Sequence, residues 1–413
     1  MNLRFLLIFV LALSGTFQAQ KTLSLSDCEQ LLQKNNLQLL AETYQISSAK
    51  AAVIQAKIWD LPVLSGELNA YNPNAKQVFN VGNTGQKAVA IEQLIQIGGK
   101  RKSEIAFEQS NVKLAELSFE QLLRSLRYEL GNHFYAYYFN QENIQRLQAQ
   151  SNQLDSLIEK YTAQVALKNI ALKDVVRLQS LNLNIKNVIA GIRQEQLDHE
   201  AKIKLLIGDA SSFQLTLANE TSYYNQPFNQ SIDRLMESAM TKNPTYLYVK
   251  YMIENSELNL IYQKKLAIPD LTVGAAYDQR GGAFQNQSNL TFKIPLPMWN
   301  RNAGNIKMAE NKIYQEQLNE KELALSMRID LQKGIDNLQF YQSSFQETQQ
   351  QQSNFNEVYE GMLSNFTLRN ISLMEFTDFM ETYSQSFIFL NEIKKQILLN
   401  RLFIHYLSSE NVN

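Results

Sequence analysis

The chain has little of several residue types, and each scarcity excludes a class of protein. Its 413 residues contain one cysteine, Cys28, so no disulfide can form within the chain. The 39 lysine and arginine residues are balanced by 40 aspartate and glutamate residues, so we expect no nucleic-acid partner. The three histidines, His133, His199 and His405, lack a second ligand at helical spacing, so we expect no metal site and no cofactor.

Long apolar runs are also missing after residue 20. The run Phe5–Leu13 follows Arg4, and small or polar residues continue to Ala19. This is the pattern of a secretory signal peptide over residues 1–20, because the run is too short to span a membrane as a helix. No cysteine stands just after the expected cut, so we expect no lipid anchor. No later run of 18 apolar residues occurs, so no α-helical span is expected.

Proline is scarce, and its positions divide the chain. The seven prolines stand at 62, 73, 227, 244, 269, 295 and 297, which leaves residues 74–226 and 298–413 free of proline. Helix interiors exclude proline because it removes a backbone donor and clashes with the preceding turn. We therefore expect the long helices in these two blocks.

Apolar residues in both blocks repeat at alternating spacings of three and four, which is the heptad pattern of coiled coils. In the first block the series is Ile144, Leu147, Ser151, Leu154, Ile158, Tyr161 and Val165, then Leu178, Leu181, Ile185, Val188 and Ile192. In the second block it is Phe355, Tyr359, Met362 and Phe366, then Phe376, Phe379, Tyr383, Phe387 and Leu390. Each block is predicted to form an antiparallel helical hairpin, the first from near Ser103 to Gly208.

Four short segments have the composition of β-strands: 62–71, 87–97, 271–277 and 288–294. In the fourth, Asn289 and Thr291 alternate with Leu290 and Phe292, which predicts one polar and one apolar face. Gly98-Gly99 is expected to end the second strand and start the long helix. A first helix is expected after Ser26, where Ser26 and Glu29 fit a capping box, and to run to about Trp59.

The same order of elements occurs twice. The turn sequence 165–177 is nearly repeated at 366–379, and Leu61-Pro62 is echoed by Ile268-Pro269. We therefore divide the chain into a signal peptide (1–20), a first repeat (21–208), a connector (209–230) and a second repeat (231–413).

Four strands cannot close a membrane barrel, because such barrels start at about eight strands. Three chains would supply twelve strands and two would supply eight. The predicted fold is mainly α with a membrane β-barrel, in which duplicated helical hairpins form an α-barrel. An ordinary solvated helix bundle is the alternative that the helical pattern alone leaves open.

Gln93–Arg101, Ile294–Ile306 and the two turn sequences together carry a resemblance to a known family. They resemble the TolC-like outer-membrane efflux proteins, and Ile294–Ile306 is similar to the form of the heavy-metal (CusC/CzcC-type) branch. The resemblance implies a homotrimer with a 12-stranded barrel in the outer membrane of a Gram-negative bacterium. It also implies a helical tunnel in the periplasm, contact with outer-membrane lipid, and docking to a periplasmic adapter served by an inner-membrane pump of the resistance-nodulation-division type.

The resemblance also implies a channel gate. Carboxylates that ring the narrow end in the family fall on Glu375 and Asp378 here, with Asp174 and Arg177 at the corresponding positions of the first half. A ring of carboxylates favours cations, and Arg177 is expected to tie one hairpin to the other. The alternative is that Glu375 and Asp378 form a solvated helix face. The family's tip glycine is replaced by Lys168 and Arg369.

The tips themselves are expected to contact the adapter. The candidate residues are Asn169, Ile170 and Leu172 in the first tip and Asn370, Ile371 and Leu373 in the second. The alternative is that these apolar residues only close the local turn.

The function that the resemblance implies is a passive exit duct of a tripartite efflux system. A periplasmic adapter, or a structural coiled-coil protein without a channel, is the alternative. No catalytic constellation occurs, so an enzyme is not expected. The exported substrate is not encoded in a recognisable motif.

Overall fold

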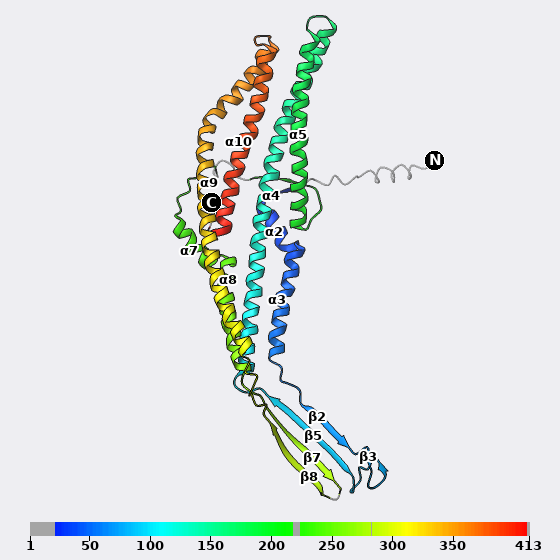
Figure 1. Ribbon diagram of the computed structural model, residues 1–413. Helices are drawn as coiled ribbons and strands as arrows, with labels where there is room; N and C mark the ends of the chain where they lie inside the picture. Colours follow the sequence, from blue (N-terminus) through cyan, green and yellow to red (C-terminus); the bar gives the residue numbers. More distant parts are fainter. Residues whose placement is uncertain (1–20, 218–223, 282, 411–413) are drawn as a thin grey trace, which may run out of the picture. The chain divides into compact units, whose positions relative to one another are not determined.

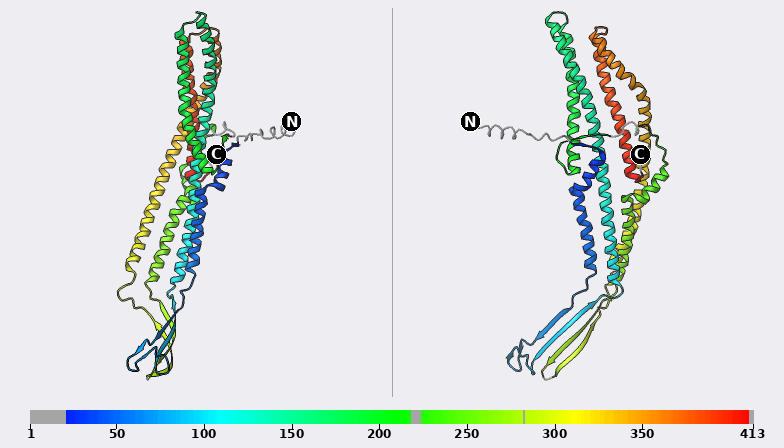
Figure 2. Two further views of the ribbon diagram at one scale, coloured as in Figure 1. Left: turned by 90° about the vertical axis from the view of Figure 1, so that its right-hand side faces the viewer. Right: turned by 180° about the vertical axis from the view of Figure 1, so that it is seen from behind.

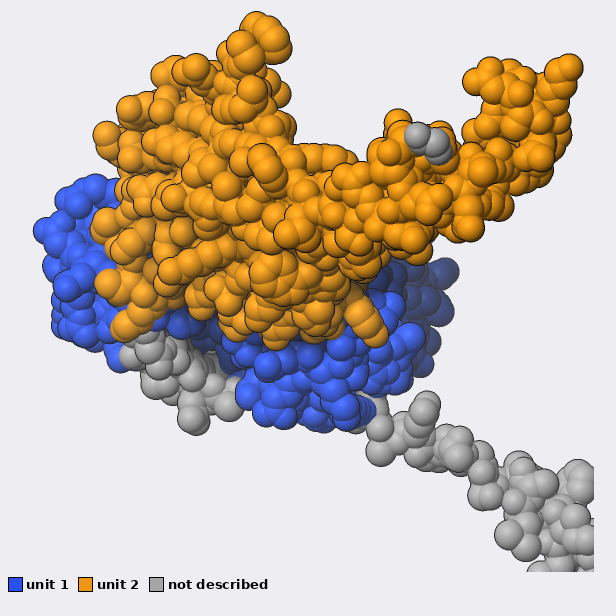
Figure 3. All heavy atoms as spheres, turned by 90° about the horizontal axis from the view of Figure 1, so that it is seen from below, with its two compact units in different colours: residues 1–40, 122–239, 328–413 blue, residues 41–121, 240–327 orange. Residues whose placement is uncertain are grey.

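The computed structural model describes residues 21–217, 224–281 and 283–410, so the predicted signal peptide lies outside the described residues. Side chains of residues 350–356 are also not described, and the predicted seam residue Phe355 is among them. Two compact units divide the chain (Figure 3). Unit 1 comprises residues 1–40, 122–239 and 328–413, and unit 2 comprises residues 41–121 and 240–327. Each unit takes segments from both halves of the sequence.

Unit 2 contains a four-stranded antiparallel sheet (Figure 1). Its strands, in spatial order, are β2 (Val63–Leu68), β5 (Gln86–Ile95), β7 (Leu271–Arg280) and β8 (Phe284–Lys293). The prediction of four strands is confirmed. The two halves of the chain meet where β5 pairs with β7 from Gln86 opposite Arg280 to Ile95 opposite Leu271. A separate small ribbon is formed by β3 (Tyr71–Asn72) and β4 (Gln77–Val78).

The two faces of this sheet differ in polarity. Leu64, Ile91, Ala275 and Leu290 lie opposite one another across the four strands and therefore share a face. The neighbouring rows on this face add Val89 and Tyr277 on one side and Val273 and Phe292 on the other, together with the polar residues Ser288 and Gln93. Leu290 and Phe292 are 90% and 78% exposed. The other face carries mainly small and polar side chains, with Val63 and Leu94 as apolar exceptions. The predicted alternation of β8 is thus confirmed.

A polar contact on the second face depends on a glycine. The Lys293 ammonium on β8 lies 2.6 Å from the Glu92 carboxylate on β5. The intervening strand β7 contributes Gly274, which lies directly opposite Glu92. A Cβ on Gly274 would be 2.7 Å from the Ile91 carbonyl and 2.9 Å from Glu92 Cγ, so a side chain there would disturb both the ladder and the ion pair.

The helices of unit 2 adjoin the ends of these strands. They are α3 (Leu37–Ala56), the first part of α4 (Lys100–Ala166), α8 (Pro244–Leu266) and the first part of α9 (Ala303–Thr367). Gly98 and Gly99 have φ of +72° and +79° and form the expected turn before α4. At this turn the nearly buried Lys100 ammonium lies 2.7 Å from Asp270, which immediately precedes β7.

Unit 1 contains the two helical hairpins. The first consists of the end of α4 and α5 (Leu172–Ile207), and the second of the end of α9 and α10 (Leu373–Ser408). Both tips lie at the same end of the unit (Figures 1 and 2). The unit also contains the helices α2 (Leu25–Asn35) and α7 (Ile232–Lys242). Two short strands, β1 (Lys21–Leu23) and β6 (Phe213–Leu215), pair in parallel, and β6 lies in the predicted connector. Among the described helices, none combines the length and the apolarity that a membrane span requires.

The prediction for the first helix was wrong in two respects. Its N-cap is Ser24, which forms a capping box with Asp27, so the helix starts before Ser26. The chain also breaks between α2 and α3 at Asn36, whose ψ of 118° is extended. The Asn36 side chain accepts a hydrogen bond from the Leu39 amide at 2.9 Å and so starts a second helix. Asn243 starts α8 in the same way.

Candidate functional site: the hairpin tips and the contacts that join them

Both tips are the same turn. At the first, the Lys168 amide donates to the Val165 carbonyl at 2.9 Å and the Asn169 amide to the Gln164 carbonyl at 3.0 Å. At the second, the Arg369 and Asn370 amides make the equivalent bonds at 3.0 and 2.8 Å. This is the Schellman pattern that closes a helix around one left-handed residue. Lys168 and Arg369 hold that position with φ of 59° and 62°, where glycine is usual.

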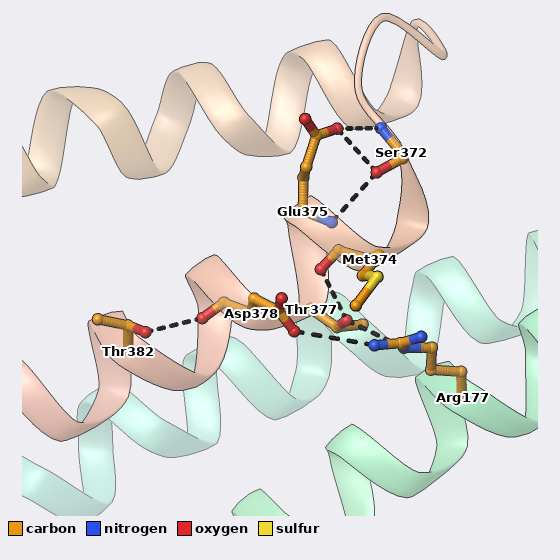
Figure 4. A network of polar contacts seen from close by, with 7 residues as sticks. All are labelled: Arg177, Ser372, Met374, Glu375, Thr377, Asp378 and Thr382. Atoms are coloured by element: carbon orange, nitrogen blue, oxygen red, sulfur yellow. Dashed lines mark hydrogen bonds and ion pairs between the residues drawn. The ribbon is translucent and has the colours of Figure 1, made fainter.

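The helices that follow the two turns begin differently. Ser372 is the N-cap of α10, and its amide and hydroxyl donate to the Glu375 carboxylate at 2.8 and 2.7 Å (Figure 4). These bonds from the Ser372 amide and hydroxyl lower the pKa of Glu375. The N-cap of α5 is Ala171, which provides no side-chain bond. The Glu375 carboxylate is thus engaged in its own helix cap.

An ion pair joins the two hairpins one turn further on. Arg177 on α5 points toward α10 (Figure 4), and its Nη2 lies 3.8 Å from Asp378 Oδ1. The same guanidinium donates from Nε to the Thr377 hydroxyl at 3.2 Å. The predicted contact between Arg177 and the second hairpin is present, although 200 residues separate Arg177 from Thr377.

Asp174 and Glu375 lie outside this pair. The amide of Asp174 donates to the Ala171 carbonyl at 3.0 Å in the first turn of α5. The charges of Arg369 and Asp174 both act on the hydroxyl of Tyr161, whose pKa is raised chiefly by burial. The structure therefore brings Arg177 and Asp378 together, and places Asp174 nearer the turn.

Stacked aromatic rings connect the hairpins beside the ion pair. The ring of Tyr161 on α4 stacks on Phe366 at 5.5 Å between centroids, and Phe366 stacks on Phe376 at 4.1 Å. Phe366 and Phe376 are buried in the core of the hairpin ends, which also includes Leu154, Leu178 and Met380. Because one core is built from all four helices, the two hairpins pack as one body in this region.

Further contacts between the hairpins lie on α4, and the sequence reading did not anticipate them. The guanidinium of Arg146 lies 5.5, 5.3 and 5.7 Å from the ring centroids of Tyr359, Tyr383 and Phe387. The amide of Gln150 donates to the Met380 carbonyl at 3.1 Å. The rings were predicted as seam residues of the second hairpin. Nothing in the sequence around Arg146 indicated that its side chain would contact the second hairpin.

Apolar side chains are exposed at both tips. Leu172 is exposed as predicted, whereas Ile371 and Leu373 pack partly against the core. Ile170 is half-buried, and Asn169 and Asn370 are exposed. The structure adds three exposed residues that the sequence reading missed: Leu167, Leu368 and Met374.

The fold is that of the TolC-like outer-membrane channels. One similar solved structure is that of CusC, which was studied for its folding and transmembrane channel formation. It superposes on this chain with a TM-score of 0.74 at 15% identity, and the match covers 93% of this chain and 92% of CusC. The CmeC outer membrane channel of Campylobacter jejuni gives 0.73 at 12% identity, covering 94% and 86%. The predicted combination of duplicated hairpins and a strand domain is thereby confirmed.

A sequence relative points to one branch of these proteins. The cobalt-zinc-cadmium resistance protein CzcC of Cupriavidus metallidurans is 20% identical over 293 residues, which are 71% of this chain and 67% of the relative. No family model matches the chain. The resemblance to TolC-like proteins of the heavy-metal branch is confirmed by this match together with the fold.

Proposed function

We propose that three copies of this chain form a passive exit duct through the outer membrane. The observation that carries the proposal is the four-stranded sheet of unit 2, which has one exposed apolar face, one polar face and two open edges. An exposed apolar face of this kind calls for a lipid environment or another protein. The polar face then lines a water-filled interior.

The dimensions of the strands suit an outer-membrane barrel. Three of the four strands have 10 residues. Ten residues at about 3.3 Å each, tilted by about 45°, cover about 23 Å, close to the apolar band of about 25 Å in such barrels. Strand length therefore supports a membrane-spanning role.

The sheet edges support closure by further copies. Since β2, β5, β7 and β8 alternate in direction, the edge strands β2 and β8 run in opposite senses. The β8 edge of one copy can then pair antiparallel with the β2 edge of the next, and the alternation continues around the barrel. Twelve strands from three copies leave no open edge, whereas a single copy leaves two.

The two hairpins of unit 1 supply the periplasmic part in this proposal. Their seams are narrow, and polar side chains dominate outside the seams, which suits a tube wetted on both sides. Arg177 and Asp378 hold the ends of the hairpins together as the closed gate, and Asp378 contributes to a ring of negative charge. Glu375 lies close by, and its carboxylate also caps α10.

The exposed tips are the proposed contact with a periplasmic adapter that connects the duct to an inner-membrane pump. Leu167, Leu172, Leu368 and Met374 present the apolar surface that such a contact needs. Two hairpins joined to one sheet argue against the adapter alternative, which calls for a single hairpin flanked by small β-domains. The likeness to CzcC makes metal ions a candidate cargo.

Cross-linking between strand edges tests the assembly. Ser65 on β2 and Asn289 on β8 lie in the same row of the sheet on the polar face. Variants that combine Ser65→Cys with Asn289→Cys or with Thr291→Cys, treated in membranes with a short bismaleimide, should give covalent dimers and trimers. A variant with only one of these substitutions should give neither, because the native Cys28 is buried.

An internal pair provides the matched control. Ala90 and Ala276 lie opposite each other on the central strands β5 and β7. The Ala90→Cys/Ala276→Cys variant should cross-link only within one chain. If the edge variants also give only monomers in outer-membrane fractions, closure of the barrel by several copies is refuted.

A further inference from the structure

Two of the three histidines meet inside the first hairpin. His133 on α4 and His199 on α5 lie with their Nδ1 atoms 2.9 Å apart and their ring planes at 50°. The sequence analysis considered only ligands at helical spacing and so did not pair these two residues. Helical spacing only detects neighbours on one helix, whereas these two residues are 66 positions apart and are joined by the fold of the hairpin.

The surroundings favour a lone pair on Nδ1 of His133. A neutral imidazole has one N–H donor and one acceptor nitrogen. The Glu129 carboxylate lies 4.0 Å from Nε2 of His133, one helical turn away on α4. This distance is too long for a hydrogen bond, but the negative charge favours the proton on Nε2 and so leaves the lone pair on Nδ1. In the absence of a metal, an N–H of His199 donated to this lone pair accounts for the 2.9 Å distance, and a metal ion that binds both nitrogens takes the place of that proton.

The separation also matches two neighbouring positions around a metal ion. Imidazole nitrogens bind divalent transition metals at about 2.0–2.1 Å, so nitrogens 2.9 Å apart would subtend about 90° at the ion. That angle belongs to square-planar and octahedral coordination, which Cu²⁺ and Ni²⁺ adopt with nitrogen ligands. A tetrahedral ion would need the nitrogens about 3.3 Å apart.

The local charge is compatible with a cation. The charged side chains that act on the two rings are Glu129, Glu195, Asp198, Lys202 and Lys395. These three carboxylates and two ammonium groups give a net charge of −1 around the pair.

We propose that His133 and His199 form a two-imidazole site for a divalent transition-metal ion of the Cu²⁺ or Ni²⁺ class, which bridges α4 and α5. Water completes the coordination, because no cluster of three or more metal-binding side chains occurs in the described part of the chain. Glu129 is a positioning residue that orients His133. The site lies within one hairpin and does not depend on the exit-duct function.

Titration of the full-length protein with Cu²⁺ tests the proposal. The protein is purified in detergent without a polyhistidine tag, and binding is followed at neutral pH by calorimetry and by electron paramagnetic resonance. One Cu²⁺ per chain should bind, with a spectrum that shows two equatorial nitrogens. The His199→Gln and His133→Gln variants should each lose the two-nitrogen spectrum and at least tenfold in affinity.

The third histidine provides the matched control. Nδ1 of His405 on α10 lies 2.7 Å from the Glu410 carbonyl and is not part of the pair, so His405→Gln should bind Cu²⁺ like the unaltered chain. Glu129→Gln should keep two nitrogens in the spectrum and lower the affinity by about tenfold to a hundredfold. Absence of a two-nitrogen spectrum in the unaltered chain, or equal binding by His199→Gln, overturns the proposal.

Discussion

Removing the ion pair between the hairpins should shift the duct toward its open state by a measurable factor. Arg177 and Asp378 are 45% and 65% exposed, so solvent screens their attraction strongly. Exposed pairs of this kind contribute about 0.2–1 kcal/mol each. Three copies around a trimer would contribute about 0.6–3 kcal/mol, which corresponds to about a threefold to a hundredfold change in the ratio of closed to open channels.

Single-channel recording in planar bilayers measures this ratio. Arg177→Ala, Asp378→Ala and the double variant should each raise the open probability, and the double variant should add little to either single change. Exchange of the charges, Arg177→Asp with Asp378→Arg, should restore part of the closed population. At about 1 M salt, where the Debye length is about 3 Å, the variants and the unaltered protein should converge.

A second ion pair serves as the matched control. Lys186 lies 3.1 Å from Asp155 at a similar exposure of 49% and 53%, but both residues belong to the first hairpin. Lys186→Ala should leave the open probability unchanged. If the effects of Arg177→Ala and Asp378→Ala simply add, or if Lys186→Ala opens the channel equally, the assignment of the gate to this pair is wrong.

Two further predictions concern local structure. Because its pKa is lowered in the folded chain, Glu375 stabilises the start of α10 above its ordinary pKa, and this stabilisation is lost as the pH falls through the lowered value. Hydrogen-exchange mass spectrometry should show less protection of residues 373–377 below about pH 4 than at neutral pH. At neutral pH, Ser372→Ala should lower the protection of the same residues by about twofold to thirtyfold. Equal protection in either comparison would contradict the capping role. Gly274→Val should reduce the yield of the heat-sensitive trimer, because the new side chain meets the Ile91 carbonyl. Gly191→Ala should not reduce it, because a Cβ at Gly191 meets nothing within 4 Å. An unchanged yield for Gly274→Val would refute the packing argument.

Much of the architecture follows from local patterns along the chain. The strands show their alternation, and the long helices show their heptads, because both depend on neighbours within a few residues. The predicted strand 288–294 corresponds to β8 at 284–293. The first predicted hairpin, from near Ser103 to Gly208, corresponds to α4 and α5 at 100–166 and 172–207. The turns at Lys168 and Arg369 were also located, since each interrupts two seams.

The predictions for the first helix cap and for one seam residue were wrong because two alternatives in the sequence satisfy the same local rule. Ser24 with Asp27 and Ser26 with Glu29 both offer a cap three residues before a carboxylate, and the structure uses the first. The seam continues from Ile185 through Ile189, which packs against the core, whereas Val188 is 41% exposed. Both choices fit spacings of three and four, so only packing decides between them.

Contacts between distant segments had no local signal. His133 and His199 come together only because the hairpin has a particular register. The pairing of β1 with β6 involves three residues in each strand, too few for a recognisable period. Arg177 and Asp378 were related beforehand only through the duplication, which placed them at equivalent positions of the two halves.

Conductance of the purified protein tests the central claim most directly. Full-length protein reconstituted in planar bilayers should give discrete conductance steps, small or infrequent for the unaltered chain and larger or longer-lived for the Arg177→Ala/Asp378→Ala variant. Bilayers that stay electrically silent with both proteins, although each migrates as a heat-sensitive trimer, would contradict the account of this chain as an exit duct.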